Sequence, residues 1–179
     1  MRARRAALLV AASLALTACG GDDRPATFKL YDRAPVPGVP DRTAAIGPEA
    51  SALAPDGQYW ADLIGGRDTE TPTFDFLLTQ AFFAASCVEE LGVEGCPNDF
   101  GTLDEPNVTV TVQVADVGSA TVVSDDRRNF AVTPQELFTL AGGEPPSKGS
   151  PDGYAYAPFP FLLTVRGGEI VTASQIWLP

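Results

Sequence analysis

The chain has 179 residues and a formal net charge of −11, from 12 Lys and Arg against 23 Asp and Glu. So acidic a protein is repelled by phosphate backbones, which argues against a nucleic-acid-binding function. The sequence contains no histidine, which excludes Ser-His-Asp and Cys-His catalysis and histidine-ligated zinc, and leaves carboxylate chemistry open.

The first 18 residues have the three parts of a secretory signal peptide. Three arginines (Arg2, Arg4 and Arg5) precede an apolar run from Ala6 to Leu16, and small residues follow. This order is typical of a cleaved signal. The apolar run is too short to cross a bilayer, which needs roughly 20 residues. We therefore expect residues 1–18 to be removed on export.

The tetrad Leu16-Thr17-Ala18-Cys19 resembles the lipobox of bacterial lipoproteins, the alternative being a plain secretory signal. The resemblance implies cleavage before Cys19, a diacylglyceryl thioether on its sulfur and an acyl chain such as palmitate on its amino group. Two or three acyl chains hold a protein at a membrane far more firmly than one. We expect a lipid anchor on Cys19 that holds the protein at the extracytoplasmic face of the cell membrane.

Residues 19–56 follow the predicted cleavage site. Six prolines and little hydrophobic periodicity in this stretch predict a flexible Pro-rich tether. Within it, Phe28-Lys29-Leu30-Tyr31 is apolar enough to dock on a folded domain. Loss of the signal would leave 9 basic against 23 acidic residues, a net charge of −14. We expect residues 57–179 to form one globular domain.

The first strands of this domain are expected at 58–64 and 71–78, with Gly65-Gly66-Arg67-Asp68 as the turn between them. Apolar and polar residues alternate in the second strand. This places Phe74, Phe76 and Leu78 on one face and Thr73, Asp75 and Leu77 on the other.

A helix is expected from Thr79, as its cap, to Leu91, with Gly92 as its stop. Its apolar side, which includes Cys87, would pack against the sheet. Cys96 follows in the next loop. An even pair of cysteines in an exported domain predicts a disulfide, whose loop of about ten residues would stabilise the fold by roughly 2.5–3 kcal/mol. The alternative is two free thiols, one buried and one in the loop.

The second half predicts further strands, one short helix and one tight turn. Thr133-Pro134-Gln135-Glu136 is a capping-box sequence that opens the helix, and Gly142-Gly143 ends it. Gly167-Gly168 permits a primed turn between the last two strands. The strands are expected at 108–114, 120–124, 159–166 and 169–177.

About six short strands and two helices make an α+β domain. Strands that are neighbours in sequence tend to pair antiparallel. We therefore expect a curled antiparallel sheet or a small, partly open β-barrel, with the longer helix plugging one side or end.

Several short segments carry a resemblance that covers residues 56–179. They are Asp56-Gly57-Gln58-Tyr59, Thr73-Phe74-Asp75 before a Phe-rich helix, Asn98-Asp99-Phe100, Pro134-Gln135-Glu136-Leu137, Val165-Arg166-Gly167-Gly168-Glu169-Ile170-Val171 and Gln175-Ile176-Trp177-Leu178-Pro179. With them the chain resembles a set of uncharacterised exported proteins and lipoproteins of actinobacteria. The resemblance implies the fold and an exported location, and implies no activity.

Asp75 is the candidate for a chemical role. A carboxylate buried beside Phe74 and Phe76 would have a raised pKa and could act as a general acid. Alternation along the strand favours the other interpretation, a polar position facing solvent.

A loop with four oxygen-bearing side chains, Asn98, Asp99, Asp104 and Glu105, is a weak calcium candidate. Calcium takes six to eight oxygen ligands, and the spacing is not that of an EF-hand. We expect no metal or cofactor. Asp125-Asp126-Arg127-Arg128 is expected to be a solvated turn with local ion pairs.

Five aromatic residues near the last hairpin could line a cleft for a hydrophobic ligand or could belong to the core. They are Tyr154, Tyr156, Phe159, Phe161 and Trp177.

The expected function is therefore a non-enzymatic binding or accessory module of the cell envelope, which engages an exported protein or a small apolar ligand. The alternative is a carboxylate-dependent hydrolase that acts on envelope polymers.

Overall fold

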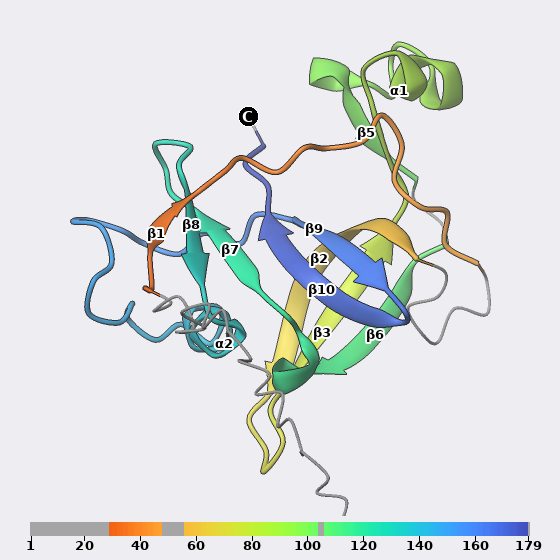
Figure 1. The fold of residues 1–179 in the computed structure, drawn as a ribbon. Coiled ribbons are helices and arrows are strands. Elements are labelled where there is room, and N and C mark those ends of the chain that lie inside the picture. Colours follow the sequence, from red (N-terminus) through yellow and green to blue (C-terminus); the bar gives the residue numbers. More distant parts are fainter. Residues whose placement is uncertain (1–28, 48–55, 104–105, 179) are drawn as a thin grey trace, which may run out of the picture.

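The computed structural model describes residues 29–47, 56–103 and 106–178. Eight strands form one sheet in the order β1-β8-β7-β10-β9-β2-β3-β6, and β4 and β5 form a separate ribbon (Figure 1). The α+β class is confirmed, with more strands than the expected six. Edge strands β1 and β6 are not paired with each other in the described part of the chain, so the sheet is open.

The strands are β1 (Asp32–Ala34), β2 (Gly57–Arg67), β3 (Thr73–Thr79), β4 (Ala81–Phe83), β5 (Phe100–Thr102), β6 (Val108–Gln113), β7 (Ala120–Val123), β8 (Asn129–Val132), β9 (Phe161–Arg166) and β10 (Glu169–Gln175). The helices are α1 (Ala84–Leu91) and α2 (Pro134–Ala141), with short 3₁₀ turns at Pro97–Asp99 and Val114–Asp116.

The sheet is antiparallel except where β10 pairs parallel with β7, through Ala173 beside Ala120. A parallel pair requires a crossover connection, and here β8, α2 and the loop after it provide one. The crossover packs α2 against β7 and β2. Its buried Leu137 and Leu140 join the main core with the inward side chains of the sheet.

The predicted alternation in β3 is confirmed. Phe74, Phe76 and Leu78 are buried in the main core, whereas Thr73, Asp75 and Leu77 on the other face are partly exposed. Phe161 from β9 packs edge-on against Phe76, with ring centroids 6.0 Å apart. One face of β3 therefore builds the core, as the period of two indicates.

The turn expected at Gly65–Asp68 is wrong, because β2 continues through Gly66 to Arg67. The register shifts between Leu63 and Gly65, where Ile64 is an extra residue opposite β3. A glycine inside a strand often marks such a bulge or a close approach of another segment. The chain reverses instead between Arg67 and Thr73.

The start predicted for the first helix, at Thr79, is wrong, because the helix begins several residues later. Residues 81–83 form β4 and pair with β5, so α1 starts at Ala84. The end at Gly92 is confirmed by its φ of 73°. The helix does not cover the main sheet: Cys87 is its buried residue, in a small core with Phe82 and Cys96. Figure 1 shows α1 and the ribbon as a lobe at one end of the sheet.

The described part of the predicted tether is packed on the domain, which corrects the expectation of a flexible segment for residues 29–47. We call these residues the strap. Tyr31 is buried before β1, which pairs with β8, and Thr43 is buried against Ala81 of the lobe. The backbone of the strap thus finds partners at two places on the sheet and ribbon, in keeping with the docking that Phe28–Tyr31 predicted. In Figure 1 the strap runs from β1 across one end of the sheet to the lobe.

The predicted signal peptide, Cys19 and the rest of the predicted tether up to Phe28, together with residues 48–55, lie outside the described residues. Among the helices that the structure describes, none is long and apolar enough to cross a membrane.

Two predictions for the second half are confirmed and one strand was missed. The Glu136 N–H donates to Thr133 Oγ1 at 3.0 Å, as a helix cap requires. Gly167 and Gly168 have φ of 61° and 82°, the left-handed values of a primed turn. Strand β8 was not predicted, because its four residues follow a charged turn and carry little alternation.

Candidate functional site

A cleft of about 610 Å³ lies between α2 and the outer end of the β2–β3 hairpin. Small-molecule sites commonly have volumes of about 300–1,000 Å³. We call it the α2–β2 cleft. It is lined by Leu63, Ile64, Gly65, Gly66, Asp68, Phe74, Gln135, Phe138, Thr139, Ala141, Gly142 and Glu144.

The bulge in β2 and the two glycines after it shape one wall of this cleft. A β-carbon on Gly66 would lie 3.0 Å from Cε2 of Phe138 and 2.7 Å from the Thr73 carbonyl oxygen. Only glycine allows β2 to lie this close to the β3 backbone with the Phe138 ring of α2 beside it. The bulged residue, Ile64, is 56% exposed although it is a large aliphatic residue.

The floor of the cleft is apolar. Leu63 and Phe138 pack on the main core, and the rings of Phe74 and Phe138 meet edge-on with centroids 5.9 Å apart. Exposed apolar side chains beside a preformed hollow are a common feature of ligand sites. The cleft can thus accept an apolar group without unfolding any element.

Polar groups lie around the rim. Asp68 follows β2, Glu144 follows α2, and both are exposed. On the helix, the Thr139 hydroxyl donates to the Gln135 carbonyl oxygen at 2.9 Å. The rim therefore carries two carboxylates and an amide, and none of the residues that line the cleft is Lys or Arg.

A buried carboxylate holds α2 in place beside the cleft. Glu136, 6% exposed, accepts hydrogen bonds from the Tyr31 hydroxyl at 2.6 Å, the Ser147 N–H at 2.8 Å and the Ser147 hydroxyl at 2.5 Å. Burial by itself would raise the pKa of Glu136, but the hydrogen bonds from Ser147 and Tyr31 outweigh it and lower the pKa. Conversely, burial and the bond to Glu136 raise the pKa of the Tyr31 phenol. The strap, α2 and the loop after α2 thus meet at one ionised group.

A second buried polar residue, Gln175, holds the loop that leads into β9. Its side chain is fully buried, donates to the carbonyl oxygens of Ala157 at 2.6 Å and Phe159 at 3.2 Å, and accepts from the Val123 N–H at 2.9 Å. Since each of its side-chain polar atoms has a partner, its burial costs little. Nothing in its sequence neighbourhood distinguishes Gln175 from a surface strand residue.

Asp75 lies apart from the α2–β2 cleft. Its carboxylate is on the opposite face of β3, where it accepts from the Thr111 hydroxyl at 2.5 Å and lies 3.9 Å from Nε of Arg67. The side chain is 20% exposed. Two other depressions, of about 670 and 340 Å³, are likewise lined by other residues. The structure places Asp75 as a polar cross-strand residue.

The five aromatic residues near the last hairpin do not gather into one site. Phe161 is in the main core, Tyr154 packs edge-on against Tyr31 at 5.5 Å, and Trp177 lies under the Arg127 guanidinium at 3.8 Å. Tyr156 packs on the main core. None of the five lines the α2–β2 cleft.

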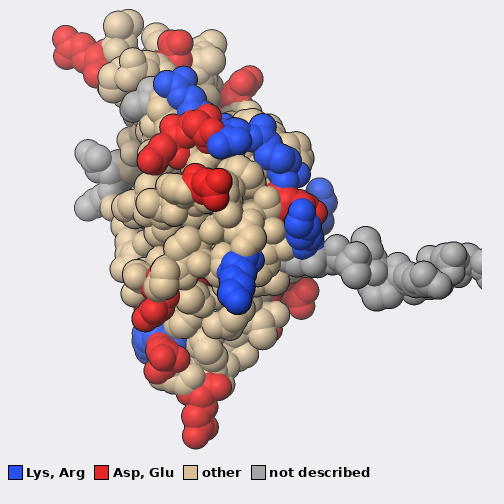
Figure 2. Space-filling model, turned by 90° about the vertical axis from the view of Figure 1, so that its left-hand side faces the viewer, with Lys and Arg blue, Asp and Glu red and all other residues tan. Residues whose placement is uncertain are grey.

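Within the charged turn 125–128, Asp126 makes the local ion pair that was expected, whereas Arg127 reaches Trp177. Asp126 forms an ion pair with Arg128 and accepts from the Ser124 hydroxyl. Hydrogen bonds from Arg128 and Ser124 lower the pKa of the Asp126 carboxyl. On the side of the molecule shown in Figure 2, acidic and basic side chains are interspersed.

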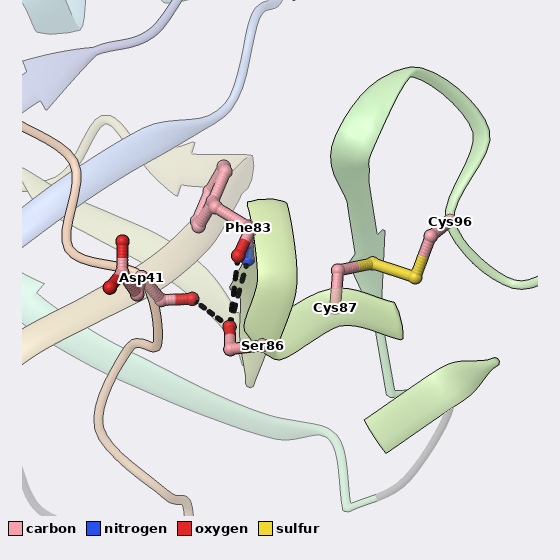
Figure 3. The surroundings of a disulfide bond; sticks show 5 residues. All are labelled: Asp41, Phe83, Ser86, Cys87 and Cys96. Atoms are coloured by element: carbon pink, nitrogen blue, oxygen red, sulfur yellow. Dashed lines mark hydrogen bonds between the residues drawn. A yellow bond between two sulfur atoms is a disulfide. The ribbon is translucent and has the colours of Figure 1, made fainter. Parts of the chain in front are cut away.

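The Cys87–Cys96 disulfide is present, with an S–S distance of 2.15 Å and Cα atoms 5.8 Å apart. Figure 3 shows Cys87 directly after Ser86 in α1, and the Ser86 hydroxyl donates to the Asp41 carbonyl oxygen of the strap. The strap is thus joined to the first turn of α1, and the disulfide pins the helix to the loop after it.

In the calcium candidate loop, Asn98 and Asp99 adopt left-handed φ of 61° and 58°. Asp104 and Glu105 lie outside the described residues. Within the residues that are described, no group of three or more Cys, Asp or Glu side chains is arranged to hold a metal ion.

The α2–β2 cleft was missed in the sequence because Gly65-Gly66 was interpreted as a turn. An aliphatic residue followed by two glycines inside an alternating strand was the available signal for a bulge. Comparisons of the chain with protein-family models, with curated proteins and with solved structures found no match.

Proposed function

We propose that this protein is a lipid-anchored binding module of the cell envelope that receives a ligand with an apolar body in the α2–β2 cleft. The observation that carries the proposal is the cleft itself: about 610 Å³, with Leu63, Phe74 and Phe138 as an apolar floor. A preformed apolar cleft with a few polar groups at its rim is the usual form of a small-molecule site.

The carboxylates favour binding over hydrolysis. Asp68 and Glu144 are exposed and come from opposite walls of the cleft. Asp75 is held by Thr111 on the outer face of the sheet. Asp62 is on that same face, and partial burial of its carboxyl group raises its pKa. Neither Asp62 nor Asp75 lines any of these three depressions, so these two carboxylates give the hydrolase alternative no support.

The proposed location, at the extracytoplasmic face of the membrane, rests on two features. They are the sequence of residues 1–19 and the disulfide, which is compatible with an oxidising compartment. Structural disulfides persist in oxidising compartments outside the cytoplasm. A place among the exported lipoproteins of actinobacteria, which the chain resembles, is part of the same proposal.

A neutral fluorescent probe tests the cleft. N-phenyl-1-naphthylamine is an apolar molecule whose emission rises when it leaves water. Added to the exported protein, it should give saturable fluorescence with a stoichiometry of one. An unsaturable signal, or none, would count against a ligand cleft.

A matched pair of variants locates the bound probe. Ala141 is exposed at the end of α2 and lines the cleft, so Ala141→Trp fills the cleft without disturbing the core. Ala85 is an exposed alanine on α1, so Ala85→Trp adds the same side chain in the lobe. Only Ala141→Trp should abolish saturable binding. Equal behaviour of the two variants would place the probe elsewhere.

A further inference from the structure

We infer that the ligand of the α2–β2 cleft is a cationic amphiphile: an alkyl or aryl body that carries a primary ammonium group. This inference rests on the proposed function and adds the chemical class of the ligand. Three observations on the walls of the cleft lead to it.

The first observation is the sign of the charged side chains that line the cleft. Asp68 and Glu144 lie on its two walls, and the residues that line it include no basic side chain. Both carboxylates are exposed. A cation that enters between them is attracted by both, and an anion is repelled by both.

The second observation is the end of the helix that faces the cleft. Ala141 and Gly142, at the C-terminus of α2, line the cleft together with Glu144. A helix C-terminus carries partial negative charge, and α2 has no Lys or Arg in its last turn to offset it. The backbone therefore adds to the negative potential that the two carboxylates produce.

The third observation is the position of the nearest arginine in the sequence. Arg67 stands between Gly66 and Asp68, but its Nε lies 3.9 Å from the Asp75 carboxylate on the outer face of the sheet. Gly66 is on the inner face, where its missing β-carbon leaves room for Phe138. Alternation along β2 therefore turns the Arg67 side chain away from the cleft.

The apolar floor of the cleft indicates the chemistry of the uncharged body of the ligand. A hydrated inorganic cation would gain nothing from Leu63, Phe74 and Phe138, whereas an alkyl or aryl chain buries apolar surface on them. An ammonium group on such a chain would reach the rim, where the carboxylates and the Gln135 and Thr139 side chains can accept its hydrogen bonds.

Displacement of bound N-phenyl-1-naphthylamine tests the class of ligand. Octylammonium, 1-octanol and octanoate share one chain and differ in charge. Below the concentrations at which they form micelles, octylammonium should displace the probe at a concentration about three- to ten-fold lower than 1-octanol, with octanoate weakest. Added salt should narrow the gap, because exposed charges are screened.

Two double variants distinguish an effect of the two rim carboxylates from an effect of the net charge of the protein. D68N/E144Q should remove the preference for octylammonium and leave displacement by 1-octanol unchanged. E89Q/E94Q, on the lobe, changes the net charge equally and should keep the preference. If octylammonium displaces the probe no better than 1-octanol does, or if D68N/E144Q keeps the preference, the inferred class of ligand is wrong. The proposal that the cleft binds a ligand would not be affected by that result. If the probe itself does not bind in the cleft, the proposed function fails first.

Discussion

At Gly66 the backbone of β2 lies so close to the β3 backbone, with the Phe138 ring of α2 beside it, that no other residue fits without a shift. A β-carbon there would lie 2.7 Å from the Thr73 carbonyl oxygen and 3.0 Å from the Phe138 ring, whereas one on Gly65 would have nothing nearer than an Asp75 carboxylate oxygen at 3.9 Å. The two glycines are adjacent in sequence and differ only in the face of the strand that they occupy. Their comparison tests the close packing on the inner face of β2, where Thr73 of β3 and Phe138 of α2 both approach Gly66.

Gly66→Ala should therefore lower the free energy of unfolding by about 1–3 kcal/mol, the usual cost of overpacking. Gly65→Ala should change it by no more than about 0.5 kcal/mol. Urea denaturation of both variants measures the difference. Similar stabilities would mean that β3 and α2 do not crowd Gly66 as closely as described.

Glu136 should make the free energy of unfolding depend on pH. Its pKa is lowered in the folded protein, so its contribution is complete above the unfolded pKa, about 4.3, and is lost as the pH falls through the folded value. Glu136→Gln should cost about 1.5–3 kcal/mol at pH 7, where a buried charged hydrogen bond is lost. The difference from wild type should shrink as the pH falls below about 4. Denaturation at a series of pH values measures this, with exposed Glu94→Gln as control; a gap that does not change with pH would show that the Glu136 charge is not involved.

At the scale of elements, local patterns predicted β3, β6, the α2 cap and the β9–β10 turn, because each is determined by neighbours in sequence. The α1 start and the end of β2 were wrong because tertiary partners decide them: β5 pairs with residues 81–83, and Phe138 packs on Gly66. Gln175 and Glu136 could not be predicted as buried, because their partners are many residues away. The cleft depends on these same distant contacts, so none of it was predicted as a site.

The disulfide belongs to the lobe and should stabilise it locally. Cys87→Ser with Cys96→Ser removes a loop constraint worth roughly 2.5–3 kcal/mol in chain-entropy estimates. Amide hydrogen exchange should accelerate in α1 and in the β4–β5 ribbon, with β3, β9 and β10 unchanged. Uniform acceleration throughout the sheet would show that the lobe and sheet unfold as one unit.

At the scale of the molecule, the strap contacts α2, β8 and the lobe, all of which are distant from it in sequence. Tyr31 bonds Glu136 of α2, residues 32–34 pair with β8, and Thr43 bonds Ala81 of the lobe. The strap begins ten residues after Cys19, the predicted site of lipidation. We propose that the domain is held near the membrane by this short connection, with α2 beside the cleft joined to the strap through the Tyr31–Glu136 hydrogen bond.

Attachment through Cys19 has a direct test in cells. Cys19→Ser removes the sulfur that would carry the diacylglyceryl group, so the protein should leave the membrane fraction or remain unprocessed. Cell fractionation and immunoblotting measure this, with Cys87→Ser as a control that keeps the predicted anchor. A Cys19→Ser protein that stays with the membranes as the wild type does would contradict lipid anchoring.

Binding in the α2–β2 cleft is tested most directly by mapping it residue by residue in solution. Backbone amide shifts of the ¹⁵N-labelled protein should be followed during titration with octylammonium. The proposed function predicts saturable changes concentrated in Leu63–Asp68 of the hairpin and Gln135–Glu144 of α2, and little change in α1. Changes that fall mainly on the lobe or the outer face around Asp75, or no saturable change at all, would contradict it.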